Sequence, residues 1–411
     1  MVIPQAEGTV PPEKELAMFE QVEDYPVDPI MIGADYFAQD PRADKLNLTV
    51  GIYQDAQGQT PVLQAVKLAE QRLVDTQASK SYLALTGDAE YCRLLGQEIF
   101  GATYDDSWVA AQTAGGAVAL RVMADLLAQI PKPPTVWLQT PTYGNYVPIL
   151  TAAQARFAHV PYYDAIGRKM TFDQMMDGLK SAKSDDVFLM QGVCHNPTGA
   201  EMSAEQFDLL LDVLAARGII PWIDLAYLGF AQSWDDDCEM ARKIAARFSE
   251  CIVCVTLSKS FGIYRDRAGA LLVKTRPSDR ERMQRAVSAI VRSGASHAPD
   301  HGPSVVRTIF QNAGLKRIWL DELGQMRRRV AEVRQQIVAT EQAMFGTNTL
   351  AYIANQSGMF SLLPLSDAQE TELTRDHGIH VVKGGRVNVA RLGPNDIEKL
   401  IRAMSVITGP Q

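Results

Sequence analysis

One lysine, Lys259, stands among hydroxyl, glycine and arginine residues in the stretch TLSKSFGIYRDRAG (256–269). The apolar run CIVCV (251–255) before it predicts a buried strand, so Lys259 would follow a strand end, where side chains commonly meet a ligand. Lost hydration at such a place lowers the pKa of a lysine, so that more of it is the neutral amine, which is a nucleophile. The stretch therefore predicts a nucleophilic lysine, and the alternative is an ordinary charged loop residue.

A carboxylate, Asp224, lies inside the apolar stretch WIDLAYLGF (222–230), and Tyr227 follows three residues later. A buried carboxylate needs a cation or several donors to offset its lost hydration. Two partners satisfy this requirement: an arginine in a structural ion pair, or a protonated ring nitrogen of a ligand. The stretch by itself leaves both open.

Two turns with small residues complete the set of chemically suggestive motifs. QTAGGAVALR (112–121) is a strand end, a glycine turn and a helix start, which exposes backbone N–H groups at the positive end of the helix dipole and suits a phosphate; a plain helix start is the alternative. CHNPTGA (194–200) places Asn196 after a strand, either as a donor into a crevice or as part of an Asn-Pro turn.

These groups together match the needs of pyridoxal 5′-phosphate. Lys259 would form an imine with its aldehyde, and Asp224 would keep its pyridine nitrogen protonated so that the ring accepts electrons. The glycine turn and Arg267 would hold its phosphate. The combination is more specific than any of its parts.

The order of predicted elements explains how distant groups could share one site. Short apolar strands alternate with amphipathic helices, and the predicted strands are 135–141, 153–163, 186–193, 218–227, 251–257 and 268–275. One predicted helix starts after the N-cap Ser203 and stops at Gly218. Such alternation predicts a mainly parallel sheet covered on both faces, with ligands at the carboxyl ends of the strands.

The pattern changes after about residue 315 to a long helix, short strands within 359–365 and 380–392, and a last helix from Pro394. This predicts a smaller α+β domain that the amino-terminal segment joins. The charged residues Arg327, Arg328 and Arg329 are expected on the solvated face of the long helix.

Composition excludes several classes of function. The chain has 411 residues, is 46% hydrophobic and carries a formal net charge of −8, which argues against a nucleic-acid-binding protein because phosphate binding needs a basic face. No stretch approaches 18 apolar residues, so no membrane span is expected. The first 20 residues read as a flexible arm and not as a targeting signal, which favours a cytoplasmic location. Five scattered cysteines predict free thiols, and six dispersed histidines suggest no metal site.

Many ordered motifs resemble one family, the class I (fold type I) aminotransferases of the aspartate and aromatic amino acid branch. They span nearly the whole chain: DPI (28–30), VGIYQDAQGQTPVLQAVKLAE (50–70), SYLALTGDAEY (81–91), PTYGNY (141–146), CHNPTGA, IDLAYLGF, SKSFGIYRDRAG, SGMFSLL (357–363) and GRVNVARL (385–392). The resemblance implies an α/β fold with a mainly parallel seven-stranded sheet between helices in a large cofactor-binding domain (60–320). It also implies a small α+β domain formed by 1–59, with its N-terminal arm, and 321–411.

The resemblance also implies roles for single residues. Lys259 matches the lysine that bonds to the cofactor and moves the Cα proton, with Asp224 at the pyridine nitrogen and Tyr227 and Asn196 as donors to the phenolic oxygen. The other residues implied to bind the cofactor are Arg267, Thr256, Gly115, Gly116, Ala117, Tyr143 and, from the neighbouring subunit of a homodimer, Tyr82. The residues implied to bind substrate are Arg386 at the α-carboxylate, Gly51 as the lid glycine, Asn196, Tyr143 and, from across the dimer interface, Arg292 at a side-chain carboxylate.

The chain departs from the family pattern at several of these places. Gly115, Gly116 and Ala117 stand where Ser-Gly-Thr is usual, so two hydroxyl donors to the phosphate are missing, which predicts weaker cofactor retention. Three further departures are Tyr143 for a stacking tryptophan, and Tyr146 and Gln191 for two histidines in the network behind Asp224. His297 replaces a common asparagine near Arg292.

The function implied is ping-pong transfer of an α-amino group between an L-amino acid, aspartate, glutamate or aromatic, and a 2-oxo acid such as 2-oxoglutarate. Two alternatives share the fold: β-decarboxylation or β-elimination, and transamination in a specialised biosynthetic pathway. A third alternative, a non-catalytic member that only binds a partner, is disfavoured because Lys259, Asp224 and Arg386 are all present.

Overall fold

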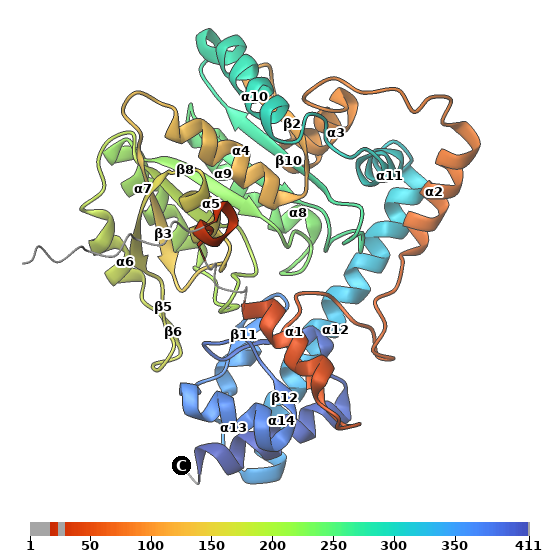
Figure 1. Ribbon diagram of the computed structural model, residues 1–411, viewed down its shortest axis with the longest axis vertical. Helices are drawn as coiled ribbons and strands as arrows, with labels where there is room; N and C mark the ends of the chain where they lie inside the picture. The colour runs from red at the N-terminus through yellow and green to blue at the C-terminus, as the bar shows by residue number, and fades with distance from the viewer. Residues whose placement is uncertain (1–16, 24–28, 410–411) are drawn as a thin grey trace, which may run out of the picture.

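A computed structural model describes residues 17–23 and 29–409 (Figure 1). The predicted flexible arm, the first 20 residues, falls largely on residues 1–16, outside the described residues. In the part that is described, no helix is long and apolar enough to cross a membrane. All five cysteines are buried free thiols, as expected from their scattered positions.

A seven-stranded sheet forms the centre of the upper part of the molecule in Figure 1. Its strand order is β2 (Trp108–Ala114), β10 (Ala268–Lys274), β9 (Cys251–Thr256), β8 (Ile220–Leu225), β7 (Val187–Gln191), β3 (Thr135–Thr140) and β4 (Arg156–Pro161). Only β10 runs antiparallel to its neighbours, so the predicted mainly parallel sheet is confirmed.

The central strands are apolar throughout because helices cover both faces of the sheet. Every residue of β7 and β9 is buried, as is every residue of β8 after Ile220. Strands covered on both faces show continuous apolar runs and not an alternation of apolar and polar residues. The predicted strands therefore appear at their predicted places.

The helices divide into two layers around the sheet. One face packs against α4 (Gly116–Ala128), α5 (Tyr146–Ala152) and α10 (Arg280–Gly294). The other face packs against α3 (Ala89–Phe100), α6 (Phe172–Leu179), α7 (Ala204–Arg217), α9 (Glu239–Arg247) and α11 (His301–Phe310). The predicted caps of α7 are confirmed, because Ser203 accepts from Gln206 N and Gly218 adopts a left-handed conformation with φ 67°.

The carboxyl-terminal elements gather in the lower part of Figure 1, and the 33-residue helix α12 (Ala313–Phe345) runs from the sheet region to them. They are β11 (Phe360–Leu362), α13 (Asp367–His377), β12 (Ile379–His380), β13 (Arg386–Asn388) and α14 (Pro394–Thr408). The amino-terminal strand β1 (Leu46–Asn47) pairs with β12, and α1 (Pro29–Gln39) lies alongside. Domain boundaries at residues 59/60 and 320/321 stay a prediction.

The expectation for the three adjacent arginines of α12 is wrong for two of them. Arg328 is exposed, but Arg327 and Arg329 are half-buried. Arg329 donates to the carbonyls of Ala390 and Leu392, at 2.9 and 3.1 Å. Helical spacing of apolar residues does not reveal that a long side chain beside the apolar stripe meets main-chain carbonyls of another segment.

Candidate active site

A cavity of about 240 Å³ lies at the carboxyl ends of several strands of the sheet. Most of the predicted site residues line it. The lining residues are Gly51, Gly116, Ala117, Leu120, Tyr143, Gln191, Asn196, Asp224, Ala226, Tyr227, Thr256, Ser258, Lys259, Tyr264 and Arg267. The sequence motifs thus converge because parallel strands place their carboxyl ends along one edge.

Asp224 has a side-chain partner that the sequence did not identify. It is 5% exposed near the end of β8, and its Oδ2 accepts a hydrogen bond of 2.8 Å from the hydroxyl of Tyr146, the first residue of α5. Its Oδ1 is buried without a hydrogen-bond partner, and within residues 17–23 and 29–409 no cationic side chain lies within 4.0 Å of it. The structural ion pair with arginine, one of the two options from the sequence, is therefore ruled out for the described residues.

Desolvation also dominates the ionisation of Asp224. Burial raises the pKa of this carboxyl to about 6, while the Tyr146 hydrogen bond and the charge of Lys259 act to lower it. A carboxylate with one free, buried oxygen is suited to accept a hydrogen bond from a cationic ring N–H. The second option from the sequence, a protonated ring nitrogen, fits this geometry.

Lys259 follows β9 and faces the same space. Burial lowers the pKa of its ammonium group to about 8, Asp224 opposes that change, and the positive charge of Arg267 adds to it. The Lys259 Nζ lies 5.0 Å from the centre of the Tyr227 ring. A larger neutral fraction near neutral pH makes this amine a better nucleophile and a better base than a surface lysine.

Gln191 and Asn196 form a rigid pair at the end of β7. The Gln191 side chain accepts from Asn196 N and donates to Asn196 O, each at 2.8 Å. The Gln191 side chain thus fixes the Asn196 turn, and within the described residues no side-chain hydrogen bond joins it to Asp224. Asn196, 4% exposed, is thereby held with its side chain toward the cavity.

The other end of the cavity is formed by the glycine turn before α4 and by Arg267. Gly115 has φ 80°, and a Cβ there would lie 2.6 Å from Arg267 Nη2. A Cβ on Gly116 would lie 2.0 Å from Thr256 Oγ1, so only glycine lets this hydroxyl reach the helix start. Free N–H groups at a helix start beside an arginine form a site for an anion.

Arg386, on β13, approaches the cavity from the carboxyl-terminal part. It is 7% exposed, donates to Thr49 O at 2.5 Å and to Asn196 Oδ1 at 3.4 Å, and its guanidinium lies 4.6 Å from the centre of the Phe360 ring. A Cβ on Gly51 would lie 3.0 Å from Phe360 Cζ. Phe360 is thus a site residue that the sequence did not identify; it stands in the motif SGMFSLL, but an apolar residue there gives no chemical signal.

Four predicted site residues do not line the cavity within one chain. Gly115 and Arg386 lie against residues that do, whereas Tyr82 and Arg292 are exposed. Tyr82 is 88% exposed and stacks on the His297 ring with centres 4.8 Å apart. Arg292 Nη1 donates to Ser296 Oγ at 2.8 Å, and this hydroxyl lies 3.2 Å from His297 Nδ1. Both residues therefore sit together on the surface, near the unusual His297.

The fit of pyridoxal 5′-phosphate can be tested on these atoms. The orphaned Asp224 Oδ1 matches a ring N–H, and the amine of Lys259 matches an aldehyde. The turn at Gly115 and Gly116, where any Cβ would fill the space beside Arg267 and Thr256, matches a phosphate. The residues present fit the cofactor. In the described part of the chain no three metal-ligating side chains come together.

A lysine amine, a buried carboxylate, an anion-binding turn and an arginine at the strand ends of an α/β sheet define a pyridoxal-phosphate-dependent type of site. Residues 43–404 match the family described as aminotransferase class I and II, and the chain belongs to this family. It is 38% identical over 397 residues to the aspartate aminotransferase of Escherichia coli (strain K12), covering 95% of this chain and all of that one.

Solved structures of similar proteins agree with this assignment. The aromatic-amino-acid aminotransferase of Burkholderia pseudomallei, covalently bound to pyridoxal phosphate, superimposes with a TM-score of 0.92 at 30% identity, over 96% of this chain and 100% of that one. An aromatic amino acid aminotransferase with 3-indolepropionic acid superimposes with a TM-score of 0.90 at 33% identity, over 94% and 99%. The fold is therefore that of fold type I aminotransferases.

Proposed function

We propose that this chain is a pyridoxal 5′-phosphate-dependent aminotransferase that transfers an α-amino group between an L-amino acid, aspartate, glutamate or aromatic, and a 2-oxo acid such as 2-oxoglutarate. The observation that carries the proposal is that Lys259 and Asp224 line one cavity at the strand ends, where Arg386 contacts the lining residue Asn196. The aspartate and aromatic activities named for its relatives support the substrate class.

The chain's residues divide the work of holding the cofactor. Asp224, through its unpartnered Oδ1, would hold the ring nitrogen of the cofactor, Tyr227 and Asn196 would hold its phenolic oxygen, and Tyr143 would hold its ring. Arg267, Thr256 and the N–H groups at Gly115–Ala117 would hold its phosphate. When bound, the cofactor supplies an electron-accepting ring that stabilises negative charge at the substrate Cα.

Other residues hold the substrate and move its proton. Arg386 binds the α-carboxylate with two parallel N–H groups, a geometry that a lysine cannot supply. Lys259, whose pKa burial lowers to about 8, removes the proton from Cα and returns one during the second half of the reaction. Gly51 and Phe360 close the space above the substrate and limit the entry of water.

A homodimer is part of this proposal, because Tyr82 and Arg292 lie exposed and away from their own cavity. Each would serve the cavity of a second copy, Tyr82 at the phosphate and Arg292 at a side-chain carboxylate. Mixing two inactive variants, Lys259→Ala and Arg292→Asp, tests this idea with aspartate as substrate. Recovered activity in mixed dimers supports shared sites, whereas no recovery in a demonstrated heterodimer contradicts them.

The cytoplasmic location expected from the sequence also remains a prediction.

The decisive experiment follows the absorption spectrum of purified, cofactor-loaded protein. Aspartate, glutamate, phenylalanine and tyrosine are added separately, without any 2-oxo acid. Conversion of the cofactor to its amine form is the expected result, and the fastest amino acid defines the preferred substrate class. Release of carbon dioxide, or a spectrum unchanged by all four amino acids, would contradict transamination of this class and favour another reaction on the same fold.

A further inference from the structure

Arg334, on α12, is a buried arginine whose burial the sequence pattern did not predict. It is 2% exposed, and none of the ion pairs of the described residues includes it. Burial lowers the pKa of its guanidinium to about 10. A buried guanidinium is tolerated only when its N–H groups donate to acceptors within the protein.

Within the described residues, the hydrogen bonds of the Arg334 side chain all go to one stretch, residues 353–361, here called the 353–361 segment. Nη1 donates to Ser361 Oγ at 2.8 Å, and Nη2 donates to Phe360 O at 2.6 Å. The remaining acceptors are the carbonyls of Ile353, Ser357 and Gly358 and the side chain of Gln356. One rigid guanidinium fork thus determines the path of nine residues.

The 353–361 segment also lies directly on the turn that carries Asn196. Ser357 N donates to Gly199 O at 2.9 Å, and the Ser357 hydroxyl donates to Glu201. Each side has a glycine where the other comes close: a Cβ on Gly199 would lie 2.5 Å from Phe360 O, and one on Gly358 would lie 2.3 Å from Cys194 Cβ. The two stretches therefore leave each other little freedom to shift.

At its end, the 353–361 segment presents Phe360 to the candidate active site. The Phe360 ring lies 4.6 Å from the Arg386 guanidinium and 6.0 Å from the Tyr227 ring, nearly perpendicular to the latter. Strand β11, which starts at Phe360, pairs with β13, so that Leu362 faces Arg386 in register. A cation over an aromatic face is attracted to it, and the ring fixes where the cation can lie.

We propose that Arg334 is a positioning residue for substrate binding: by holding the 353–361 segment it places Phe360 against the Arg386 guanidinium and keeps Arg386 aligned with Asn196. This inference rests on the proposed function, because it assigns Arg386 to the substrate carboxylate. Arg334 itself touches neither substrate nor cofactor. Loss of the fork would let Phe360 and Arg386 move, which weakens carboxylate binding in ground state and transition state alike.

The test replaces the fork with a point charge in Arg334→Lys and measures two quantities. The first is the KM and kcat for the preferred amino acid. The second is the dissociation constant of 3-indolepropionic acid, a carboxylate without an amino group, measured by calorimetry on cofactor-loaded protein. We expect KM and this dissociation constant to rise about tenfold while kcat changes less than threefold, because uniform binding affects KM and not kcat.

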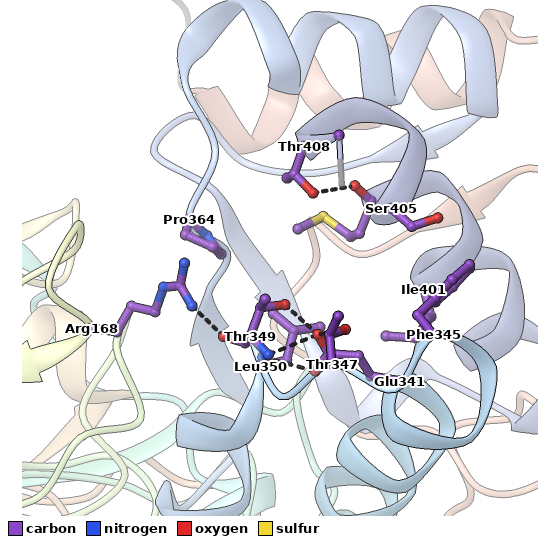
Figure 2. Close-up of a pocket in the computed structure, with 12 residues that line it drawn as sticks. Arg168, Glu341, Phe345, Thr347, Thr349, Leu350, Pro364, Ile401, Ser405 and Thr408 are labelled. Carbon is purple, nitrogen blue, oxygen red and sulfur yellow. Dashed lines mark hydrogen bonds between the residues drawn. The ribbon is translucent and has the colours of Figure 1, made fainter. Parts of the chain in front are cut away.

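Arg168 offers a matched control, because its guanidinium also donates to a main-chain carbonyl of this part of the chain. Figure 2 shows its guanidinium reaching Thr349 at the edge of another cavity, of about 350 Å³, and it also lies 5.8 Å from the Tyr352 ring. It thus holds the chain shortly before the 353–361 segment but does not contact Phe360. Arg168→Lys is expected to leave KM and the dissociation constant within twofold of the wild type.

A second variant keeps the proposal testable if Arg334→Lys does not fold. Ser361→Ala removes one acceptor of Arg334 and the 2.6 Å bond from Ser361 to Gln356, while the arginine stays. It should raise the same two constants about threefold. If the folded Arg334→Lys variant, or failing that Ser361→Ala, loses only thermal stability and keeps both constants within twofold, the inference is overturned. A wild-type protein that transaminates none of the four amino acids overturns the proposed function instead.

Discussion

The two ends of the candidate active site are built in different ways. The ring end lies around Asp224 and Asn196, and the phosphate end lies around the glycine turn and Arg267. At the ring end, buried side chains from distant parts of the chain contact each other: Tyr146 donates to Asp224 across 78 residues, and Gln191 fixes Asn196. At the phosphate end, main-chain N–H groups and one long side chain, Arg267, surround a glycine turn. Arg267 there contacts Ser258 Oγ at 3.3 Å and Tyr264 O at 3.1 Å.

This difference teaches where single substitutions matter. A buried, desolvated group that loses its partner carries the full cost of an unsatisfied charge or dipole, whereas a main-chain anion site loses one of several similar donors. The ring end therefore tolerates less change than the phosphate end. The departures from the family pattern at Gly115, Gly116 and Ala117 fall at the more tolerant end.

The largest effect is expected from Lys259→Ala. In the proposed reaction this amine moves the Cα proton, and loss of such a base lowers turnover by about 10²–10⁴-fold. Single-turnover kinetics with the preferred amino acid measure the loss. Lys67→Ala, at an exposed position of α2 (Gln64–Thr76), should leave the rate unchanged. Residual turnover within a hundredfold of the wild type would assign the proton transfer to another group.

The second prediction concerns pH. Burial lowers the pKa of Lys259 to about 8, and only the neutral amine attacks a carbonyl. In cofactor-free protein, the rate of reaction with an aldehyde should therefore rise with pH and level off above about pH 8, not near pH 10.5. Because the charge of Asp224 raises the pKa of Lys259, Asp224→Asn should move this midpoint to lower pH. A midpoint that stays the same in the variant would contradict their coupling.

Tyr146→Phe should have a smaller effect at the ring end. It removes the 2.8 Å hydrogen bond from Tyr146 to Asp224 Oδ2. In the wild type this bond lowers the pKa of the Asp224 carboxyl, so the pKa should be higher in the variant. The carboxyl is then ionised less often and should hold the ring nitrogen less firmly. A hydrogen bond to a charged group is worth roughly 1.5–3 kcal/mol, and because this bond also exists without the cofactor, only part of that free energy enters binding; the dissociation constant of the cofactor should rise by about tenfold. Titration of cofactor-free protein measures this constant. The half-buried Tyr104, changed to Phe in the same way, should leave the constant unchanged.

The smallest effect is expected at the phosphate end, where Ala117→Thr restores a hydroxyl donor. One added hydrogen bond is worth about 1 kcal/mol, which corresponds to roughly fivefold tighter cofactor binding. Ala117→Val, of similar shape without the hydroxyl, separates the hydrogen bond from packing. Equal constants for the two variants would show that the hydroxyl does not bind the phosphate. If Ala117→Thr changes the dissociation constant of the cofactor by a larger factor than Tyr146→Phe does, the phosphate end is the more sensitive of the two ends.

Much of the fold was predictable because its signals are local. The apolar strands, the caps at Ser203 and Gly218, and the long helix before the carboxyl-terminal strands all appear where the sequence placed them. Site residues such as Lys259 and Asp224 were predictable because a charged group after or inside an apolar strand is conspicuous. Residues whose role depends on a distant partner were not, and Arg334 shows why: a charge on a helix predicts exposure, yet it is almost fully buried.

The sequence by itself thus determined the succession of strands and helices, and with it the edge of the sheet where Lys259, Asp224, Asn196 and the glycine turn must meet. Only the tertiary structure decided which atoms meet there: Tyr146 with Asp224, Gln191 with Asn196, and Phe360 with Arg386. The physical reason is that periodicity and turn chemistry act over a few residues. Pairing between side chains depends instead on the strand order β2-β10-β9-β8-β7-β3-β4 and on the packing of the carboxyl-terminal segment against it, which no local pattern encodes.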